Sequence, residues 1–249
     1  MIYAAISIWL MTIVLLAWLV HHLWTTIIKP KTVHWLLLPG TFVAQTGRTI
    51  ALLLTGAKIN NTALMEDDEQ GAPATDPHYE PKIPVFGPVI VGLLPMLATG
   101  VTIYFLIVKL GMPVVMAAPQ DQISSDLPTT MSAFWDQLRA LINQAEGTLN
   151  AVMAAEMTSW KSAVFAYLMI CLTVRLAPFS GNARGHFGAI IATGGMLALI
   201  GTLSTKPAEM IEQAWPLISL TVGWLLILTM ISLLTRGVVS IIQSILNWE

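Results

Sequence analysis

Charged residues are scarce in this sequence, since Asp, Glu, Lys and Arg together make up only 10% of its 249 residues. Apolar residues make up 55%, and the mean hydropathy is +0.72. Such a chain has too little polar surface to cover a water-soluble globule. Its net charge of −2 also lacks the basic excess of nucleic-acid-binding proteins. We therefore predict an integral membrane protein that binds no nucleic acid and contacts the lipid bilayer and other membrane proteins.

Cysteine is almost absent as well. Cys171 is the only one, which excludes an intrachain disulfide and argues against a zinc site built from several cysteines. Nucleotide-binding glycine loops, haem and flavin signatures and the G-x-S-x-G motif of serine hydrolases are also missing. These absences predict a protein without a cofactor.

Long apolar runs dominate what is present. A membrane-spanning helix needs about 20 apolar residues, and six runs are candidates: 2–28, 33–55, 85–110, 160–176, 188–203 and 214–234. We predict an all-α integral membrane protein, a single polytopic domain over residues 1–249 with about six transmembrane helices. Lys and Arg are nearly balanced between the two sets of loops, so the positive-inside rule does not fix the orientation.

Some of these runs contain residues that bend helices or let them approach closely. Pro39-Gly40 breaks the second run, and Pro88 and Pro95 predict kinks in the third. The fifth run is rich in small residues that would allow close helix approach: Gly194, Gly195, Ala198 and Gly201.

Two polar loops, 58–84 and 111–159, separate the runs. An acidic cluster at 66–69 predicts a solvated or hairpin-like loop, because the ligand spacing of a calcium site is absent. Between Met131 and Val152 apolar residues recur at helical spacing, and Thr129 or Thr130 would cap the start of that helix. This amphipathic helix would lie on the membrane surface, cover the bundle or contact a partner. The tail 236–249 predicts an interfacial C-terminal helix.

One stretch of the second run carries a family resemblance. Residues 38–58 read LPGTFVAQTGRTIALLLTGAK. With Pro-Gly at the start and Thr-Gly-Ala-Lys at the end, this stretch resembles the first core helix of site-2-protease-like intramembrane metallopeptidases. That helix carries HExxH, in which two His bind zinc and the Glu is the general base. The resemblance implies a place in the bacterial cytoplasmic (inner) membrane.

The centre of this stretch departs from the family's motif. Ala44 stands at the first ligand, Gln45 at the base and Arg48 at the second ligand. Ala44 has no donor atom, Gln45 cannot take up a proton, and Arg48 stays cationic. The family's third ligand, an Asp, should fall near the end of the fourth run, where Asn182 is the nearest approximation and His186 follows. The resemblance therefore implies neither a zinc site nor a catalytic residue.

The preferred hypothesis is a catalytically inactive relative of these proteases that serves as a structural or binding subunit of a membrane assembly. Candidate binding or packing residues are Pro39, Gly40, Arg48, Asn182 and His186. A charged side chain at membrane depth normally faces a protein interior or a partner. Alternatively, Arg48 lies near one interface and extends its side chain to it.

Two further hypotheses stay open. A small-solute or anion transporter or channel would use Arg48 to select anions along a path bordered by the proline kinks. A membrane metalloprotease with a non-standard site would draw its ligands from His34, His78 and His186, which have no i,i+4 spacing among them.

Overall fold

The computed structural model describes residues 2–56, 62–67, 73–75, 86–111, 123, 127–154, 160–177, 183–204 and 206–246. Eight α-helices account for most of this part of the chain, as the all-α prediction requires. They are α1 (Ile2–Ile27), α2 (Pro30–Leu36), α3 (Leu38–Leu54), α4 (Phe86–Leu106), α6 (Met131–Ala154), α7 (Trp160–Val174), α8 (Ala183–Gly201) and α9 (Lys206–Leu246). A π-helical turn, η1 (Ile107–Gly111), extends α4.

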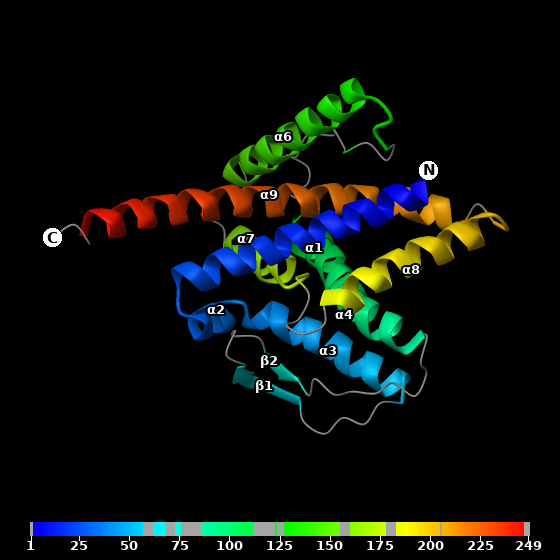
Figure 1. The fold of residues 1–249 in the computed structure, drawn as a ribbon, viewed down its shortest axis with the longest axis horizontal. Coiled ribbons are helices and arrows are strands. Elements are labelled where there is room, and N and C mark those ends of the chain that lie inside the picture. Colours follow the sequence, from blue (N-terminus) through cyan, green and yellow to red (C-terminus); the bar gives the residue numbers. More distant parts are fainter. Residues whose placement is uncertain are drawn as a thin grey trace.

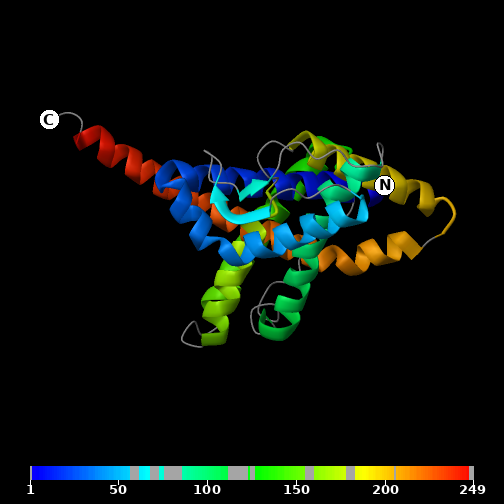
Figure 2. The same cartoon turned by 90° about the horizontal axis from the view of Figure 1, so that it is seen from below.

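Helices α1 and α9 form the long axis of the molecule. They lie side by side and run in the same direction, while α8 returns beside α1 and α3 packs along α4 (Figure 1). Figure 2 shows α7 and the later part of α4 standing across these helices and projecting on the same side. The largest buried cluster joins α1, α7 and α9, and there the rings of Phe165 and Trp224 meet edge to face with centroids 6.2 Å apart.

Several of the helices are long and apolar enough to cross a membrane, which supports a multi-pass integral membrane protein. Among the described residues these are Ile2–Ile27, Gly87–Gly111 and Lys206–Ile245, and the bent pair α2 and α3 would make a fourth span. Three or four spans among the described residues meet this criterion, fewer than the six predicted. Helix α7 has 15 residues and is about 22 Å long, below the roughly 30 Å hydrocarbon thickness. The apolar part of α8, Phe187–Gly201, is also short.

The predicted separate C-terminal helix is wrong. Helix α9 runs without interruption for 41 residues, from Lys206 to Leu246, so it contains both the sixth apolar run and the described part of the tail. The Thr235-Arg236-Gly237 sequence, which appeared to end the span, does not stop the helix because no proline follows it and Gly237 keeps helical geometry. At about 60 Å, α9 is roughly twice as long as the hydrocarbon core is thick.

The prolines of the third run do not interrupt it. Pro88 lies in the first turn of α4, where a missing N–H is harmless. Pro95 lies inside the helix, which continues to Leu106. Thr99, one turn later, donates its hydroxyl to the Pro95 carbonyl at 2.8 Å.

Close helix approach in the fifth run is confirmed at two of its glycines. A Cβ at Gly194 would collide with the Ser7 hydroxyl, and one at Gly201 with the Tyr3 ring, so both glycines let α8 lie directly on α1. Gly195 differs, because a Cβ there would meet nothing within 4 Å.

The two polar segments contain the expected elements. Strands β1 (Thr62–Asp67) and β2 (Pro73–Thr75) form an antiparallel pair, which fits the hairpin-like prediction, whereas Asp68 and Glu69 lie outside the described residues. Helix α6 begins after Thr130, whose hydroxyl accepts the Ala133 N–H at 3.1 Å, so the predicted cap is confirmed.

Two buried serines of α9 make a matched pair for a stability test. Ser219 is buried and its hydroxyl has no hydrogen-bond partner among the described residues. The Ser232 hydroxyl accepts from the Trp24 indole N–H at 2.7 Å and donates to the Leu228 carbonyl. We expect Ser219→Ala to raise the free energy of unfolding by about 1 kcal/mol and Ser232→Ala to lower it by a similar amount, as measured by denaturation in detergent. Equal destabilisation by both substitutions would contradict this assignment.

Candidate functional site

The candidate site begins at the sharp bend between α2 and α3. The two helices meet at 81° around Leu37, which is fully buried. The Leu37 N–H donates to the Val33 carbonyl at 3.0 Å, and its own carbonyl accepts from Thr41 N–H at 2.9 Å. Pro39 occupies the first turn of α3, where a helix needs no N–H from it. The bend therefore precedes the Pro-Gly pair, which belongs to α3.

Helix α7 holds this bend in place. The Leu36 carbonyl, near the end of α2, accepts the Tyr167 hydroxyl at 2.9 Å and the Cys171 thiol at 3.4 Å. These donors satisfy a carbonyl near a helix end, where intrahelical partners are missing. A Cβ at Gly40 would collide with the Cys171 carbonyl oxygen and lie 3.1 Å from Arg175 Cγ. Only glycine at position 40 allows α3 to lie this close to α7.

A buried arginine and histidine meet beside the bend. Arg175 Nη2 lies 3.2 Å from His34 Nδ1, and both side chains are buried. Because a guanidinium has donors and no acceptor, it must donate and Nδ1 must accept. The Nδ1 lone pair of His34 is thus engaged with a cation, which leaves that nitrogen unsuited to bind a metal.

The three positions of the protease-like motif share the buried side of α3. Ala44, Gln45 and Arg48 are 0%, 6% and 5% exposed. On the same helix a Cβ at Gly47 would lie 2.8 Å from Ala98 Cβ and 2.9 Å from Pro95 Cα, so α4 packs tightly against this side. The Arg48 side chain lies inside the protein and interacts there. This arrangement favours the interior interpretation of Arg48 over a side chain that extends to the interface.

The chemistry of this site is cationic and amide-like. Ala44 has no donor atom, Gln45 cannot act as a base, and Arg48 and Arg175 repel a metal ion. In the part of the chain that the structure describes, no group of three or more His, Cys, Asp and Glu residues could hold a metal.

The structure leaves part of the predicted ligand set outside its described residues. His78 and Asn182 lie outside the described residues, and the side chain of His186, which lies in α8, is not described either.

Comparisons with protein-family models, curated proteins and solved structures found no match. None of these comparisons supports the resemblance of residues 38–58 to site-2 proteases, which stays a prediction from the sequence.

Sequence reasoning missed the role of α7. Neither Tyr167 nor Arg175 was among the predicted site residues. Tyr167, Cys171 and Arg175 follow one another at intervals of four, which places them on one face of a helix. A polar face within a short apolar run was the signal that could have identified a contact surface.

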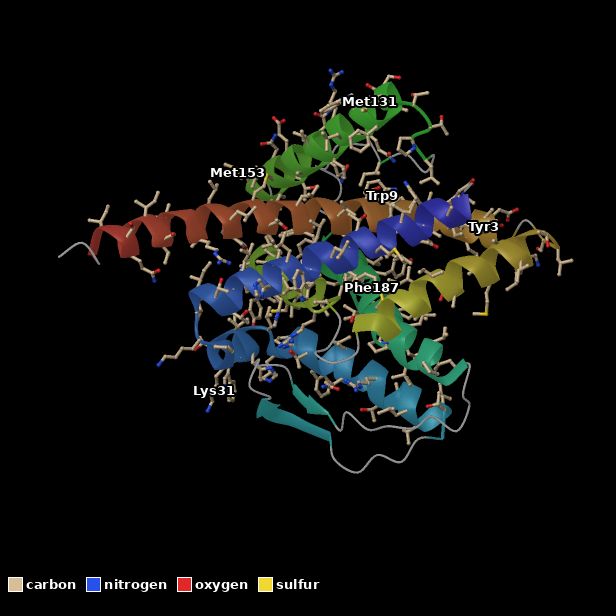
Figure 3. All side chains as sticks on the ribbon, in the orientation of Figure 1. Tyr3, Trp9, Lys31, Met131, Met153 and Phe187 are labelled. Atoms are coloured by element: carbon tan, nitrogen blue, oxygen red, sulfur yellow. The ribbon has the colours of Figure 1, made fainter. Side chains whose placement is uncertain are left out.

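A second candidate surface is the exposed side of α6. Its buried residues, which pack against the bundle, are small or polar: Gln144, Ala145, Thr148 and Ala151. Six large apolar residues of α6 are exposed and recur at intervals of three, four or seven: Met131, Trp135, Leu138, Ile142, Leu149 and Met153. We call these six residues the α6 stripe. Its end residues, Met131 and Met153, are 72% and 73% exposed and mark the two ends of α6 in Figure 3.

Measuring the metal content of the purified protein tests the inference that the site on α3 and beside the α2–α3 bend binds no zinc. We expect protein purified without chelator and without a His tag to contain no stoichiometric zinc, because the ligand positions hold Ala44 and Arg48. Mass-spectrometric metal content at known protein concentration gives the answer. Stoichiometric zinc would contradict the assignment, and its loss in His34→Ala would place the metal at the bend.

Proposed function

We propose that this chain is a non-catalytic structural or binding subunit of a membrane assembly, and that it binds a protein partner through the α6 stripe. The observation that carries the proposal is the orientation of α6, whose most deeply buried residues are small or polar while the large apolar residues of the stripe stay exposed. Contiguous exposed apolar surface on an otherwise polar helix is typical of interaction sites.

The charges of α6 favour a protein over a lipid surface. Asp136, Arg139 and Glu146 are the charged residues of this helix, so acidic groups outnumber basic ones. Helices that lie on anionic membranes instead carry clusters of Lys and Arg on their polar side. Asp136 and Arg139 also lie 3.9 Å apart, which leaves Glu146 as the main unbalanced charge beside the stripe.

The motif positions of α3 support the non-catalytic part of the proposal. Ala44, Gln45 and Arg48 cannot supply zinc ligands or a general base, and they are packed inside the protein. A kinship with site-2 proteases belongs to the same proposal and draws on the Pro-Gly start and the Thr-Gly-Ala-Lys end of residues 38–58. In such a relative, the helical scaffold would be kept while the hydrolytic site is lost.

The experiment places a photo-crosslinking amino acid at Ile142, which is 60% exposed in the middle of the stripe. We expect irradiation of intact membranes to yield an adduct with one defined membrane protein. The double variant Trp135→Ser/Leu149→Ser should weaken co-purification of that protein at least about tenfold, because apolar anchors at an interface commonly contribute more than 1 kcal/mol each.

The matched control changes the polar side of the same helix. Asn150→Ala, at an exposed position of α6, should leave the adduct and the co-purification unchanged. Adducts with lipid alone would contradict a protein partner, as would a monomer without a companion across several mild detergents.

A further inference from the structure

An apolar cavity of about 390 Å³ lies between α1, α4, α8 and α9. These helices come together around the first half of α1 (Figure 1). The lining residues are mainly aliphatic and include Ile6, Leu10, Leu93, Met96, Leu197 and Leu217. No charged side chain is among them.

The few polar groups of the lining have little to offer a polar ligand. Thr193 donates its hydroxyl to the Ala189 carbonyl, and Thr221 donates to the Leu217 carbonyl, both at 2.7 Å. The remaining polar group is the hydroxyl of Tyr104, whose side chain is more than half exposed. The inner part of the cavity therefore favours hydrocarbon over water or a hydrogen-bonding molecule.

The size of the cavity fits a chain rather than a small molecule. An apolar cavity of about 150 Å³ stays dry and holds one benzene. At the same volume per carbon atom, the cavity here would hold roughly fifteen carbon atoms. That length corresponds to most of an acyl chain.

The cavity reaches the molecular surface along α4. Leu97, Val101 and Tyr104 line it and are about half exposed, whereas Met96, Ile103 and Ile218 line it and are buried. Because α4 is one of the apolar helices long enough to span a bilayer, this opening would face hydrocarbon. A chain entering beside Tyr104 could leave its polar end near that phenol, since tyrosine favours the membrane interface.

We infer that this cavity binds one acyl chain of a bilayer phospholipid. A phospholipid fits better than a free fatty acid, because its second acyl chain keeps the charged headgroup in the hydrated interface, where it needs no cationic side chain from the lining. The inference is independent of the proposed role of the α6 stripe, since none of the stripe residues lines this cavity.

Gly100 allows the cavity to be filled without disturbing the fold. It lines the cavity, and a Cβ there would meet nothing within 4 Å. Gly100→Leu should thus place a side chain where the acyl chain would lie. Gly195→Leu is the matched control, because Gly195 has equally open surroundings in a helix but does not line the cavity.

The test uses the full chain in vesicles of phosphatidylethanolamine and phosphatidylglycerol that contain a phospholipid with a photoactivatable acyl chain. Labelling is mapped at Met96, which is 8% exposed and so is reached by a chain only through the cavity. We expect labelling at Met96 in the wild type and in Gly195→Leu. In Gly100→Leu the labelling of Met96 should fall about tenfold. This is the change in occupancy expected when about two methylene groups of the acyl chain are no longer buried.

Three outcomes would overturn the inference. Wild-type protein labelled only at exposed residues, with none at Met96 or Ile218, would mean that no chain occupies the cavity, whatever the variants do. Labelling of Met96 by a photoactivatable fatty acid but not by the phospholipid would mean that the occupant is a free acid. Labelling undiminished in folded Gly100→Leu would also contradict the proposed position of the chain.

Discussion

Gly40→Ala should cost the protein at least about 3 kcal/mol of its free energy of unfolding, the upper range for overpacking a tight contact. The new methyl group would collide with the Cys171 carbonyl oxygen, which is backbone and cannot rotate away. Helix α3 would have to separate from α7, and the Leu36 carbonyl would then lose its contacts with Tyr167 and Cys171. The loss should appear as a lower melting temperature in detergent and a smaller folded fraction.

Helix propensity alone would predict the opposite effect, a gain in stability. Alanine is more favourable than glycine inside a helix by about 1 kcal/mol, so an uncrowded glycine should tolerate the change. Gly195→Ala provides the comparison, because a Cβ there would meet nothing within 4 Å. If Gly40→Ala and Gly195→Ala had the same melting temperature, the close approach of α3 to α7 would be contradicted.

The apolar runs predicted the longest helices well because their signal is local. The first run, 2–28, corresponds to α1, and the third, 85–110, to α4 with its π-helical turn. The Pro-Gly pair predicted a break in the second run, and the break lies at Leu37, two residues before Pro39. Proline ends the preceding helix but is accommodated in the first turn of the next, which accounts for this small displacement.

Helix length was predicted less well, because composition does not show where a helix ends. The fourth run, 160–176, matches α7 to within two residues. By contrast, Arg236 and Gly237 suggested an end that α9 does not have. The continuation of α9 depends on tertiary packing, which overrides weak local preferences.

The candidate site shows the same division between local and long-range information. The sequence alone identified the motif positions Ala44, Gln45 and Arg48 and predicted that their chemistry is not hydrolytic. The contact of His34 with Arg175 joins residues 141 positions apart, and that of Leu36 with Tyr167 joins residues 131 apart. Neither pair has a local signature, since each depends on α7 standing across the bend.

Arg48→Ala should lower the free energy of unfolding by about 3 kcal/mol, because removing a large buried side chain that interacts within the protein leaves a cavity and takes away the partner of a buried group. Arg48 is 5% exposed and interacts within the protein. Arg139→Ala is the control, since Arg139 is 77% exposed and its contact with Asp136 spans 3.9 Å. That exposed pair should contribute less than about 1 kcal/mol. Denaturation of both variants in the same detergent measures the difference.

The same variant separates a subunit from a transporter. If Arg48 is a packing residue, proteoliposomes of the wild type and of Arg48→Ala should both show only background anion flux, while their stabilities differ. Flux well above background in the wild type, lost in a folded Arg48→Ala protein, would instead make Arg48 a selectivity residue and refute the subunit proposal. Because stability and flux are measured on the same preparation, loss of folding cannot be mistaken for loss of transport.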